Sequence, residues 1–316
     1  MRDIMSATAI ERSCPVCGKS GAVEILRKGE VRLVRCAGCA MVYANPVEAA
    51  LASGAFYDGL GPGFYVAADK VEGDYAPVRF ARELRLLRRF CPRGHIIDVG
   101  CSNGAFLYQV NNRFAGDYET LGVDVAGAAL DYAAAHGVAV RKGSFLDMDF
   151  ERQMFAAVTF WATLEHLVEP AAYLTKAAEI LRPGGHCFIL VPNFGSIAVR
   201  LLGAKYRYIL PQHVNYFTAA TLQKLAAHRH SLEVVHVGST HFNPIVLWQD
   251  WKSGAPVSDA DRISLLKRTT AYKQKTSLKP VRFALCLVER ALGAALLADN
   301  LVLVLRKREA SSSGKT

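Results

Sequence analysis

The sequence predicts an α/β protein in which a doubly wound, mostly parallel seven-stranded sheet follows a small zinc ribbon and carries a helical insertion near its C-terminus. Three observations lead to this prediction. From His95 onward, short apolar runs alternate with helix-like stretches, the pattern of βα units on a parallel sheet. Two Cys-x-x-Cys pairs precede that region with the spacing of a metal-binding ribbon. Before the last apolar run, residues 281–297 have an amphipathic pattern that favours a helix.

Composition and charge limit the class of protein. The chain has 316 residues, of which 51% are hydrophobic and 21% are charged, so a packed core is expected and wholesale disorder is excluded. Lys and Arg exceed Asp and Glu by 10, which raises the question of nucleic acid or an anionic membrane as a partner. The first 13 residues lack the apolar run of a secretory signal, and no stretch of about 18 residues is free of charge. We therefore expect a cytoplasmic protein.

Four of the eight cysteines form the two pairs of the ribbon: Cys14, Cys17, Cys36 and Cys39. Their spacing is C-x2-C-x18-C-x2-C, and each pair offers two thiolates from one tight turn, so together they supply the four soft ligands of tetrahedral Zn²⁺. Residues 23–34 between the pairs alternate like a short hairpin with its tip at Lys28-Gly29. The sequence thus predicts a structural zinc site, with a redox pair or free thiols as alternatives.

The pattern divides the chain into five parts. They are a zinc ribbon over 1–45, a linker and helix over 46–93, an α/β core over 94–240, a helical insertion or lid over 241–299, and the last strand with a disordered tail over 300–316. The helix of the second part is expected to begin at Pro77, and helices of the core at Pro170 and after Thr218. The expected strands are 95–100, 119–125, 138–140, 156–161, 186–191, 232–237 and 300–305.

Three strand ends of the core carry residues suited to holding a ligand, and ligands of such sheets bind at this edge. The sequence DVGCSNG (98–104) follows the first strand, where small residues let a ligand approach the backbone at a helix N-terminus. Asp124 ends the second strand, where a carboxylate can accept from both hydroxyls of a ribose. Asp147 and Met148 follow the third, where they could hold an adenine. An Asp after a strand is otherwise often a helix cap.

Residues 94–193 resemble a class I S-adenosylmethionine-dependent methyltransferase. The resemblance rests on DVGCSNG, GVDV, FLDMDF, TFWATLEHL and LRPGG before HCFILVPN, and it extends through PQHVNYFT. It implies a Rossmann-like fold and S-adenosylmethionine as cofactor. The residues that it implies for cofactor binding are Asp98, Gly100, Cys101 and Gly104 in the loop, Asp124 and Val125 at the ribose, Asp147 and Met148 at the adenine, and Phe160 and Trp161 around the sulfonium. Ser102 departs from the family, which usually has glycine there.

The N-terminal segment is similar to that of small-molecule methyltransferases with a zinc-binding segment ahead of the catalytic domain, several of which act on sugars or on cell-surface and natural-product building blocks. Methyl transfer needs donor and acceptor held in line and, for some acceptors, a base that removes a proton. The candidates for that base are Glu165 and His166 after the fourth strand and His213 and Tyr216 in the loop after the fifth. A purely structural role is the alternative for Glu165, His166 and His213.

Three functions fit these features. The first, which we expect, is methyl transfer to a small molecule such as a sugar or a cell-surface or natural-product precursor. The second is methylation of RNA or protein with the ribbon gripping the macromolecule. Against it, no Asp/Asn-Pro-Pro-aromatic block follows the fourth strand, and the ribbon lacks an aromatic and basic surface for stacking bases. The third is a non-enzymatic zinc-binding regulator that retains the fold, against which the intact Asp98, Asp124 and Asp147 weigh.

The basic surplus lies mainly in the C-terminal part. Residues 1–93 have 14 basic and 10 acidic side chains, residues 94–193 have 6 and 11, and residues 194–316 have 18 and 7. The segment 262–282 alone has seven basic residues and no acidic one. It is open to three interpretations, which are a packed helical hairpin with a solvated basic face, a lid over the acceptor, or a contact with an anionic membrane surface. Nucleic acid is not expected as a partner.

Overall fold

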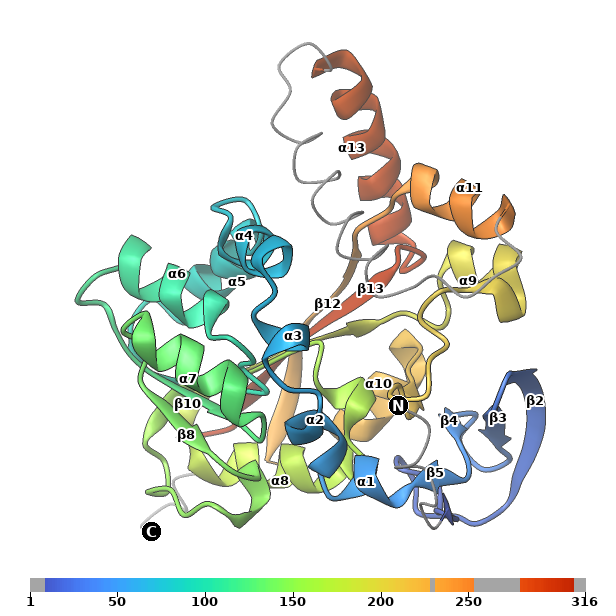
Figure 1. Cartoon of the computed structure of the whole chain (residues 1–316), viewed down its shortest axis with the longest axis horizontal. Coiled ribbons are helices and arrows are strands. Elements are labelled where there is room, and N and C mark those ends of the chain that lie inside the picture. The colour runs from blue at the N-terminus through green and yellow to red at the C-terminus, as the bar shows by residue number, and fades with distance from the viewer. Residues whose placement is uncertain (1–8, 228–230, 253–278, 310–316) are drawn as a thin grey trace, which may run out of the picture.

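The computed structural model describes residues 9–227, 231–252 and 279–309. Its centre is a seven-stranded sheet in the order β12-β13-β10-β9-β6-β7-β8 (Figure 1), which confirms the predicted doubly wound sheet. The pairs from β10 to β8 are parallel, and β13 runs antiparallel to both of its neighbours. The strands are β6 (Gly94–Val99), β7 (Tyr118–Asp124), β8 (Val140–Lys142), β9 (Phe155–Trp161), β10 (Leu181–Pro192), β12 (Leu232–Thr240) and β13 (Asn300–Lys307).

Helices cover both faces of the sheet because successive strand residues point to opposite sides and both sides are apolar. Ile96 belongs to the core cluster under α5 (Ala81–Phe90), α6 (Ala105–Arg113) and α7 (Gly127–Ala135), whereas Ile97 belongs to the cluster under α8 (Pro170–Ile180) and α10 (Ala219–Ala227). Leu84 and Leu87 supply the buried stripe of α5, as the spacing of its apolar residues predicts. This double covering leaves the edge at the carboxyl ends of the strands for a ligand.

The ribbon forms a second sheet that includes a strand from the core. β2 (Ala22–Lys28) and β3 (Val31–Cys36) make the predicted hairpin, and β4 (Val42–Ala44) and β11 (Asn215–Tyr216) complete the order β11-β4-β3-β2. A further pair, β1 (Ala9–Ile10) and β5 (Val47–Glu48), closes the N-terminal part. The ribbon is therefore joined to the core by backbone hydrogen bonds.

The segment expected to be a linker is helical. It contains α1 (Ala49–Ala52), α2 (Ala55–Gly59), α3 (Pro62–Tyr65) and α4 (Ala68–Tyr75). Helices of four to eight residues make too few turns to show a 3.6-residue period, and so the sequence pattern missed them.

Two predicted element boundaries differ as well. The helix expected to begin at Pro77 begins at Ala81, after a turn. The strand expected over 186–191 begins earlier, because the LRPGG stretch already belongs to β10, and the pairing of β10 with β9 shifts register between Leu181 and His186. A register shift absorbs the extra residues of the Pro-Gly-Gly turn.

The predicted helical insertion is present between β12 and β13. α11 (Pro244–Lys252) follows β12, and α13 (Lys279–Ala294) packs along β12 and extends outward from the body in Figure 1. An ion pair between Arg82 and Glu289 joins α13 to α5. Most of the basic segment 262–282 and the predicted disordered tail from residue 310 lie outside the described residues. No described helix is long and apolar enough to cross a membrane.

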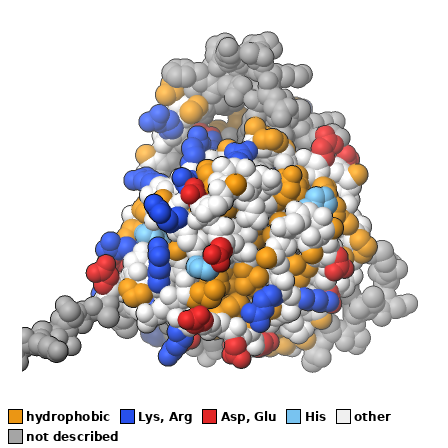
Figure 2. Space-filling model, turned by 90° about the vertical axis from the view of Figure 1, so that its left-hand side faces the viewer, with side chains coloured by type: hydrophobic (Ala, Val, Ile, Leu, Met, Phe, Trp, Pro, Cys, Tyr) orange, Lys and Arg blue, Asp and Glu red, His pale blue; other side chains and the backbone are white. Residues whose placement is uncertain are grey.

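The remaining short elements are α9 (Ile197–Leu202), η1 (Phe145–Asp147), η2 (Leu164–His166) and η3 (Gly203–Lys205). Figure 2 shows the face beside α6 and α7, where Lys and Arg side chains lie mostly toward one side and Asp and Glu side chains are scattered among them.

Candidate active site and zinc ribbon

The four ribbon cysteines come together as the spacing predicts. All four Sγ atoms lie within 4.8 Å of one another, with 3.4 Å between Cys14 and Cys39 and 3.5 Å between Cys17 and Cys36. Zn–S bonds of about 2.3 Å in a tetrahedron place sulfurs about 3.8 Å apart, so four thiolates in this arrangement fit Zn²⁺. The backbone N–H of Gly38 also donates to the Cys36 sulfur at 3.3 Å, as in an outer shell that orients a ligand.

The predicted cofactor loop turns sharply between β6 and α6. Gly100, Ser102 and Gly104 all have positive φ (76°, 51° and 75°). A Cβ at Gly104 would lie 2.7 Å from Ala133 of α7, and one at Gly100 would lie 2.7 Å from Thr163. Both glycines are thus required by the conformation and by close packing. Ser102 adopts the same left-handed conformation, which explains why glycine is usual at its position in the family that the sequence resembles.

The carboxylates at the strand ends have different surroundings. Asp98 is buried between strands and accepts a 2.6 Å hydrogen bond from Thr159 Oγ1, and burial raises its pKa to about 7. Asp124 accepts from the backbone N–H groups of Ser102 (2.8 Å) and Ala126 (3.0 Å), one on each oxygen, and burial raises its pKa. A carboxylate has about four acceptor positions, so Asp124 keeps acceptor capacity beyond its bonds to the backbone. Asp124 also lies against the cofactor loop, where the sequence placed it.

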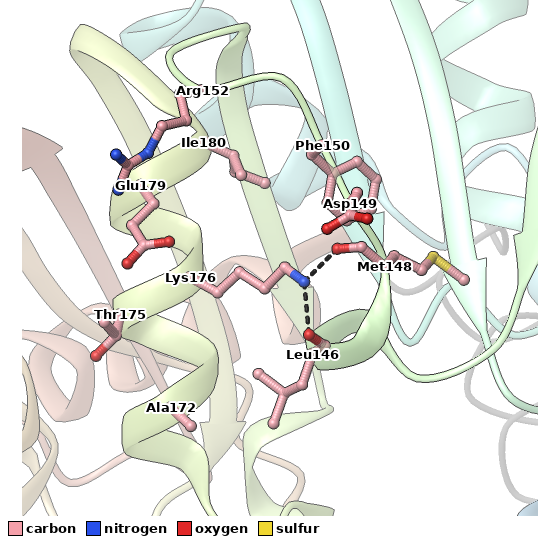
Figure 3. A pocket seen from close by; sticks show the side chains of 10 residues that line it. All are labelled: Leu146, Met148, Asp149, Phe150, Arg152, Ala172, Thr175, Lys176, Glu179 and Ile180. Atoms are coloured by element: carbon pink, nitrogen blue, oxygen red, sulfur yellow. Dashed lines mark hydrogen bonds between the residues drawn. The ribbon is translucent and has the colours of Figure 1, made fainter.

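Lys176 of α8 holds the loop that carries Asp147 and Met148. Its ammonium donates to the backbone carbonyls of Leu146 (2.7 Å) and Met148, and Figure 3 shows the side chain reaching across from the helix. The open cavity of about 640 Å³ in that view lies between α8 and the loop. Apart from Met148, the cavity involves none of the residues predicted to bind the cofactor.

We expect the substitution Lys176→Met to weaken S-adenosylmethionine binding about tenfold, because it removes two charge-assisted hydrogen bonds that fix the loop. Isothermal titration calorimetry of the variant measures this loss. The control is Thr175→Ala, since Thr175 faces the same cavity and donates only to a carbonyl of its own helix. Equal affinity of both variants and the native protein would show that this loop does not hold the cofactor.

Phe160 and Trp161 do not form one wall. They are neighbours on β9, so their side chains point to opposite faces of the sheet. Phe160 is fully buried near Phe145 in the cluster under α8, and Trp161 packs on Phe106 and Phe188 under α5. The two side chains therefore lie on different faces of the sheet, and a position of either beside the sulfonium stays a prediction.

Three of the four predicted base residues meet in one cluster. One potential ligand atom from each of Glu165, His166 and His213 lies within 4.8 Å of the other two, and the two imidazole rings are edge to face at 4.6 Å between centroids. Glu165 is only 1% exposed, its Oε2 has no hydrogen-bond partner among the described residues, and burial raises its pKa to about 8. Burial lowers the pKa of His166 to about 4. At neutral pH, the protonated carboxyl group of Glu165 and the uncharged imidazole of His166 thus lie side by side.

The surroundings of His166 assign its tautomer. Its Nδ1 lies 2.9 Å from the backbone carbonyl of Gln212 and 3.0 Å from the hydroxyl of Tyr57. A carbonyl can only accept, so Nδ1 carries the proton and Nε2 holds the lone pair. The arrangement makes Nε2 the atom of His166 that can accept a proton.

Tyr57 and the residues around it were missed by the sequence analysis, which treated 46–74 as a connector. Tyr65 donates to the carbonyl of Tyr57, and Tyr75 donates to the carbonyl of Asn103 in the cofactor loop. The amide of Asn103 donates to the carbonyl of Tyr65 and to Asp74. Two of the four short helices, α3 and α4, therefore contact the predicted cofactor loop. The only sequence signal was an unusual density of Tyr and Phe in a segment without periodicity.

Tyr216 lies apart from the cluster. Its ring packs edge to face on Phe194 in a separate core cluster, and its hydroxyl donates to the carbonyl of Leu210. On β11, Asn215 faces the turn after β9 instead, since strand neighbours alternate. This placement favours a packing role for Tyr216 over the catalytic role expected from the sequence.

Comparisons with known proteins identify the family of the catalytic domain. Residues 75–237, more than half of the chain, match a family described as "Methyltransferase domain". The ubiquinone biosynthesis O-methyltransferase of Albidiferax ferrireducens is 26% identical over 193 residues, which cover 55% of this chain and 75% of that protein. The enzyme of the same name from Dinoroseobacter shibae is 30% identical over 183 residues, which cover 52% and 68%.

Solved structures share the fold at low sequence identity. A Haemonchus contortus phosphoethanolamine N-methyltransferase 2 has a TM-score of 0.51 at 14% identity and covers 90% of this chain and 71% of its own. A SAM-dependent methyltransferase from Archaeoglobus fulgidus has a TM-score of 0.50 at 15% identity and covers 79% and 100%. With the matched domain, the sheet order and the loop geometry, these findings show that the chain belongs to the class I S-adenosylmethionine-dependent methyltransferases.

Proposed function

We propose that this methyltransferase methylates a hydroxyl oxygen of a small molecule and that the cluster of Glu165, His166 and His213 removes the proton of that hydroxyl. The observation that carries the proposal is the cluster itself, in which a buried carboxyl group and an imidazole from the turn after β9 meet a second imidazole, that of His213, from the loop between β10 and β11. Two residues before Glu165, Thr163 packs over Gly100 and donates to the carbonyl of Val99. The proposed base thus lies next to the cofactor loop.

The proposed cofactor residues are those of the strand ends. Bound S-adenosylmethionine would supply an electrophilic methyl group. Asp124 would accept from the ribose hydroxyls, Asp147 and Met148 would hold the adenine, and the loop from Gly100 to Gly104 would lie against the remainder. Asp124 has the free acceptor capacity that this role needs. Zn²⁺ would be held by the four ribbon cysteines in a structural role.

The chemistry of the cluster suits a neutral hydroxyl acceptor. As the new O–CH₃ bond forms, the acceptor oxygen becomes positive unless its proton leaves, so a base next to it lowers the barrier. His166 is uncharged and its Nε2 is free of the proton, while Glu165 becomes a carboxylate as the pH approaches 8. His213 is 7% exposed and touches the ring of His166, so a proton can be passed within the cluster.

The acceptor class follows from the relatives and from this chemistry. Both curated relatives are named as O-methyltransferases of ubiquinone biosynthesis. We therefore place phenolic hydroxyls first among acceptors and sugar hydroxyls second, the latter because the ribbon segment is similar to that of sugar-modifying methyltransferases.

The experiment is a methyl-transfer screen with the zinc-loaded protein and isotope-labelled S-adenosylmethionine. Catechol-type phenols, nucleotide sugars and total RNA are each offered, and products are identified by mass spectrometry. We expect label on a phenol or sugar oxygen and none on RNA. Label on RNA alone would overturn the small-molecule proposal. Absence of S-adenosylmethionine binding in calorimetry would favour a regulator that only retains the fold.

A further inference from the structure

Arg12, two residues before the first cysteine of the proposed zinc site, contacts the segments that border the proposed active site. Its Nη2 donates to the carbonyl of Val168 at 2.7 Å and to Asn215 Oδ1 at 3.0 Å, and its Nη1 donates to the carbonyl of Val214 at 3.3 Å. The backbone N–H of Arg12 donates to the side chain of Asn45 at the end of the ribbon. A single ribbon side chain thus contacts both segments that carry the Glu165 cluster.

Asn215 links those two segments directly. Its Nδ2 donates to the carbonyls of Leu164 (2.8 Å) and Leu167 (2.6 Å), which flank Glu165 and His166. The N–H of Val214 donates to the carbonyl of Glu165 itself at 2.8 Å. Asn215 is 2% exposed, and both of its amide hydrogens and its side-chain oxygen are hydrogen-bonded. These bonds restrict the movement of the turn at residues 164–167 and of His213, which lies two residues before Asn215.

The backbone of the ribbon holds the same strand from its other side. β11 pairs with β4, with Asn215 opposite Tyr43, and the N–H of Ala44 donates to the carbonyl of Val214. Lys224 of α10 also donates to the carbonyl of Cys39 at 3.2 Å. Buried cysteines of the ribbon share one apolar cluster with residues of the central sheet. Short contacts therefore join the cysteine-bearing turns of the ribbon to β11 and to the core.

We propose that the zinc ribbon is a positioning element of the active site, in which Arg12 and Asn215 hold the turn bearing Glu165 and His166 against the loop bearing His213, and that bound metal maintains this arrangement. Arg12 is a positioning residue, because it acts on the cluster through backbone carbonyls and Asn215. The inference rests on the proposed function for its effect on methyl transfer, but its structural part can be measured without any substrate.

The first test measures amide hydrogen exchange in the full zinc-loaded chain. For Arg12→Ala we expect exchange of the amides in 164–168 and 213–216 to rise about tenfold, since charge-assisted hydrogen bonds are lost there, with no change in 95–125. Arg27→Ala is the matched control, because Arg27 is on the same ribbon but exposed and paired only with Glu24. Unchanged exchange in Arg12→Ala relative to Arg27→Ala would overturn the proposal.

Two further variants separate positioning from loss of folding. Asn215→Asp keeps an acceptor for Arg12 but removes both donations to the turn, so it should raise exchange in 164–168 without Arg12 being altered. Arg12→Lys keeps the charge but lacks the planar fork, so partial restoration is expected. If neither Asn215→Asp nor removal of zinc by a chelator raises exchange in these segments, the ribbon does not position them.

The enzymatic readout uses the acceptor found in the screen. Arg12→Ala should lower kcat about tenfold, with S-adenosylmethionine affinity and zinc content unchanged, and Arg12→Lys should recover part of kcat. An equal loss in Arg27→Ala, or a loss confined to cofactor affinity, contradicts a positioning role. Should no acceptor be methylated, the proposed function fails while the exchange experiment still decides this inference.

Discussion

Glu165→Gln is expected to lower kcat for methyl transfer by about 10²- to 10⁴-fold, the range that a positioned general base contributes. Glutamine keeps the size of the side chain but cannot take up a proton. Glu165 is buried, and its Oε2 has no hydrogen-bond partner among the described residues. Because the two side chains have nearly the same size, the substitution should leave the surrounding packing intact. Calorimetry should show the same affinity for S-adenosylmethionine as the native protein, since the cofactor residues are unchanged.

The pH dependence provides a second and independent signature. Burial disfavours the charged carboxylate and raises the pKa of Glu165 to about 8, so the base form is the minority below that pH and grows above it. The kcat of the native protein should therefore rise as the pH increases through about 8, and Glu165→Gln should lose this rise. His166, whose pKa burial lowers to about 4, stays neutral over the same range and adds no transition there.

A matched control for Glu165 lies four residues away. Glu169 is exposed at the start of α8. The variant Glu169→Gln should therefore have the kcat and the pH profile of the native protein. If Glu165→Gln keeps the native rate and profile as well, Glu165 has a structural role and the base is one of the two histidines.

Removal of the metal is expected to have the largest effect on stability. Cys36→Ser should lower the free energy of unfolding by more than about 4 kcal/mol, since structural Zn²⁺ binding contributes directly to folding free energy. Cys36 is buried, and its cluster includes residues of the central sheet, so loss of the site also disturbs that core. Denaturant unfolding, together with the zinc content of each preparation, measures the loss.

Cys286→Ser is the control for this substitution. Cys286 is exposed on α13, outside the ribbon, and the same change there should alter the free energy of unfolding by less than about 0.5 kcal/mol. Native stability and native zinc content in Cys36→Ser would show that the ribbon does not depend on a four-cysteine metal site. Chelation of the native protein should reproduce the loss seen in Cys36→Ser.

Much of the fold could be predicted from local patterns. Seven apolar runs became the seven strands, Thr218 caps α10 by accepting from the N–H of Thr221, and Gly137 follows α7 with a positive φ. These features depend on residues within a few positions of one another, so composition and spacing are enough to indicate them. The zinc ribbon was also indicated by a local pattern. Each Cys-x-x-Cys pair implies a tight turn, and the short hairpin between the pairs brings the two turns together.

The candidate site was predicted only in part. Glu165, His166 and His213 were named from their places after two strands, and their meeting follows from the parallel order of those strands. The opposite orientations of Phe160 and Trp161 were also implied by the two-residue period of a strand. The helices of residues 49–75 were hidden because each is too short to be periodic.

The sequence by itself indicated the seven strands, most of the longer helices, the edge of the sheet proposed to bind the cofactor and the four cysteines of the proposed metal site. Only the tertiary structure decided that Tyr57 reaches His166 across 109 positions and that Arg12 reaches Asn215 across 203. Contacts of this kind depend on how segments distant in the sequence pack together in the folded protein. In addition, every residue has a backbone carbonyl, so a hydrogen bond to a carbonyl does not restrict the type of amino acid that accepts it. That is why the link between ribbon and active site is absent from every local pattern, and why it becomes visible only once β11 lies beside β4.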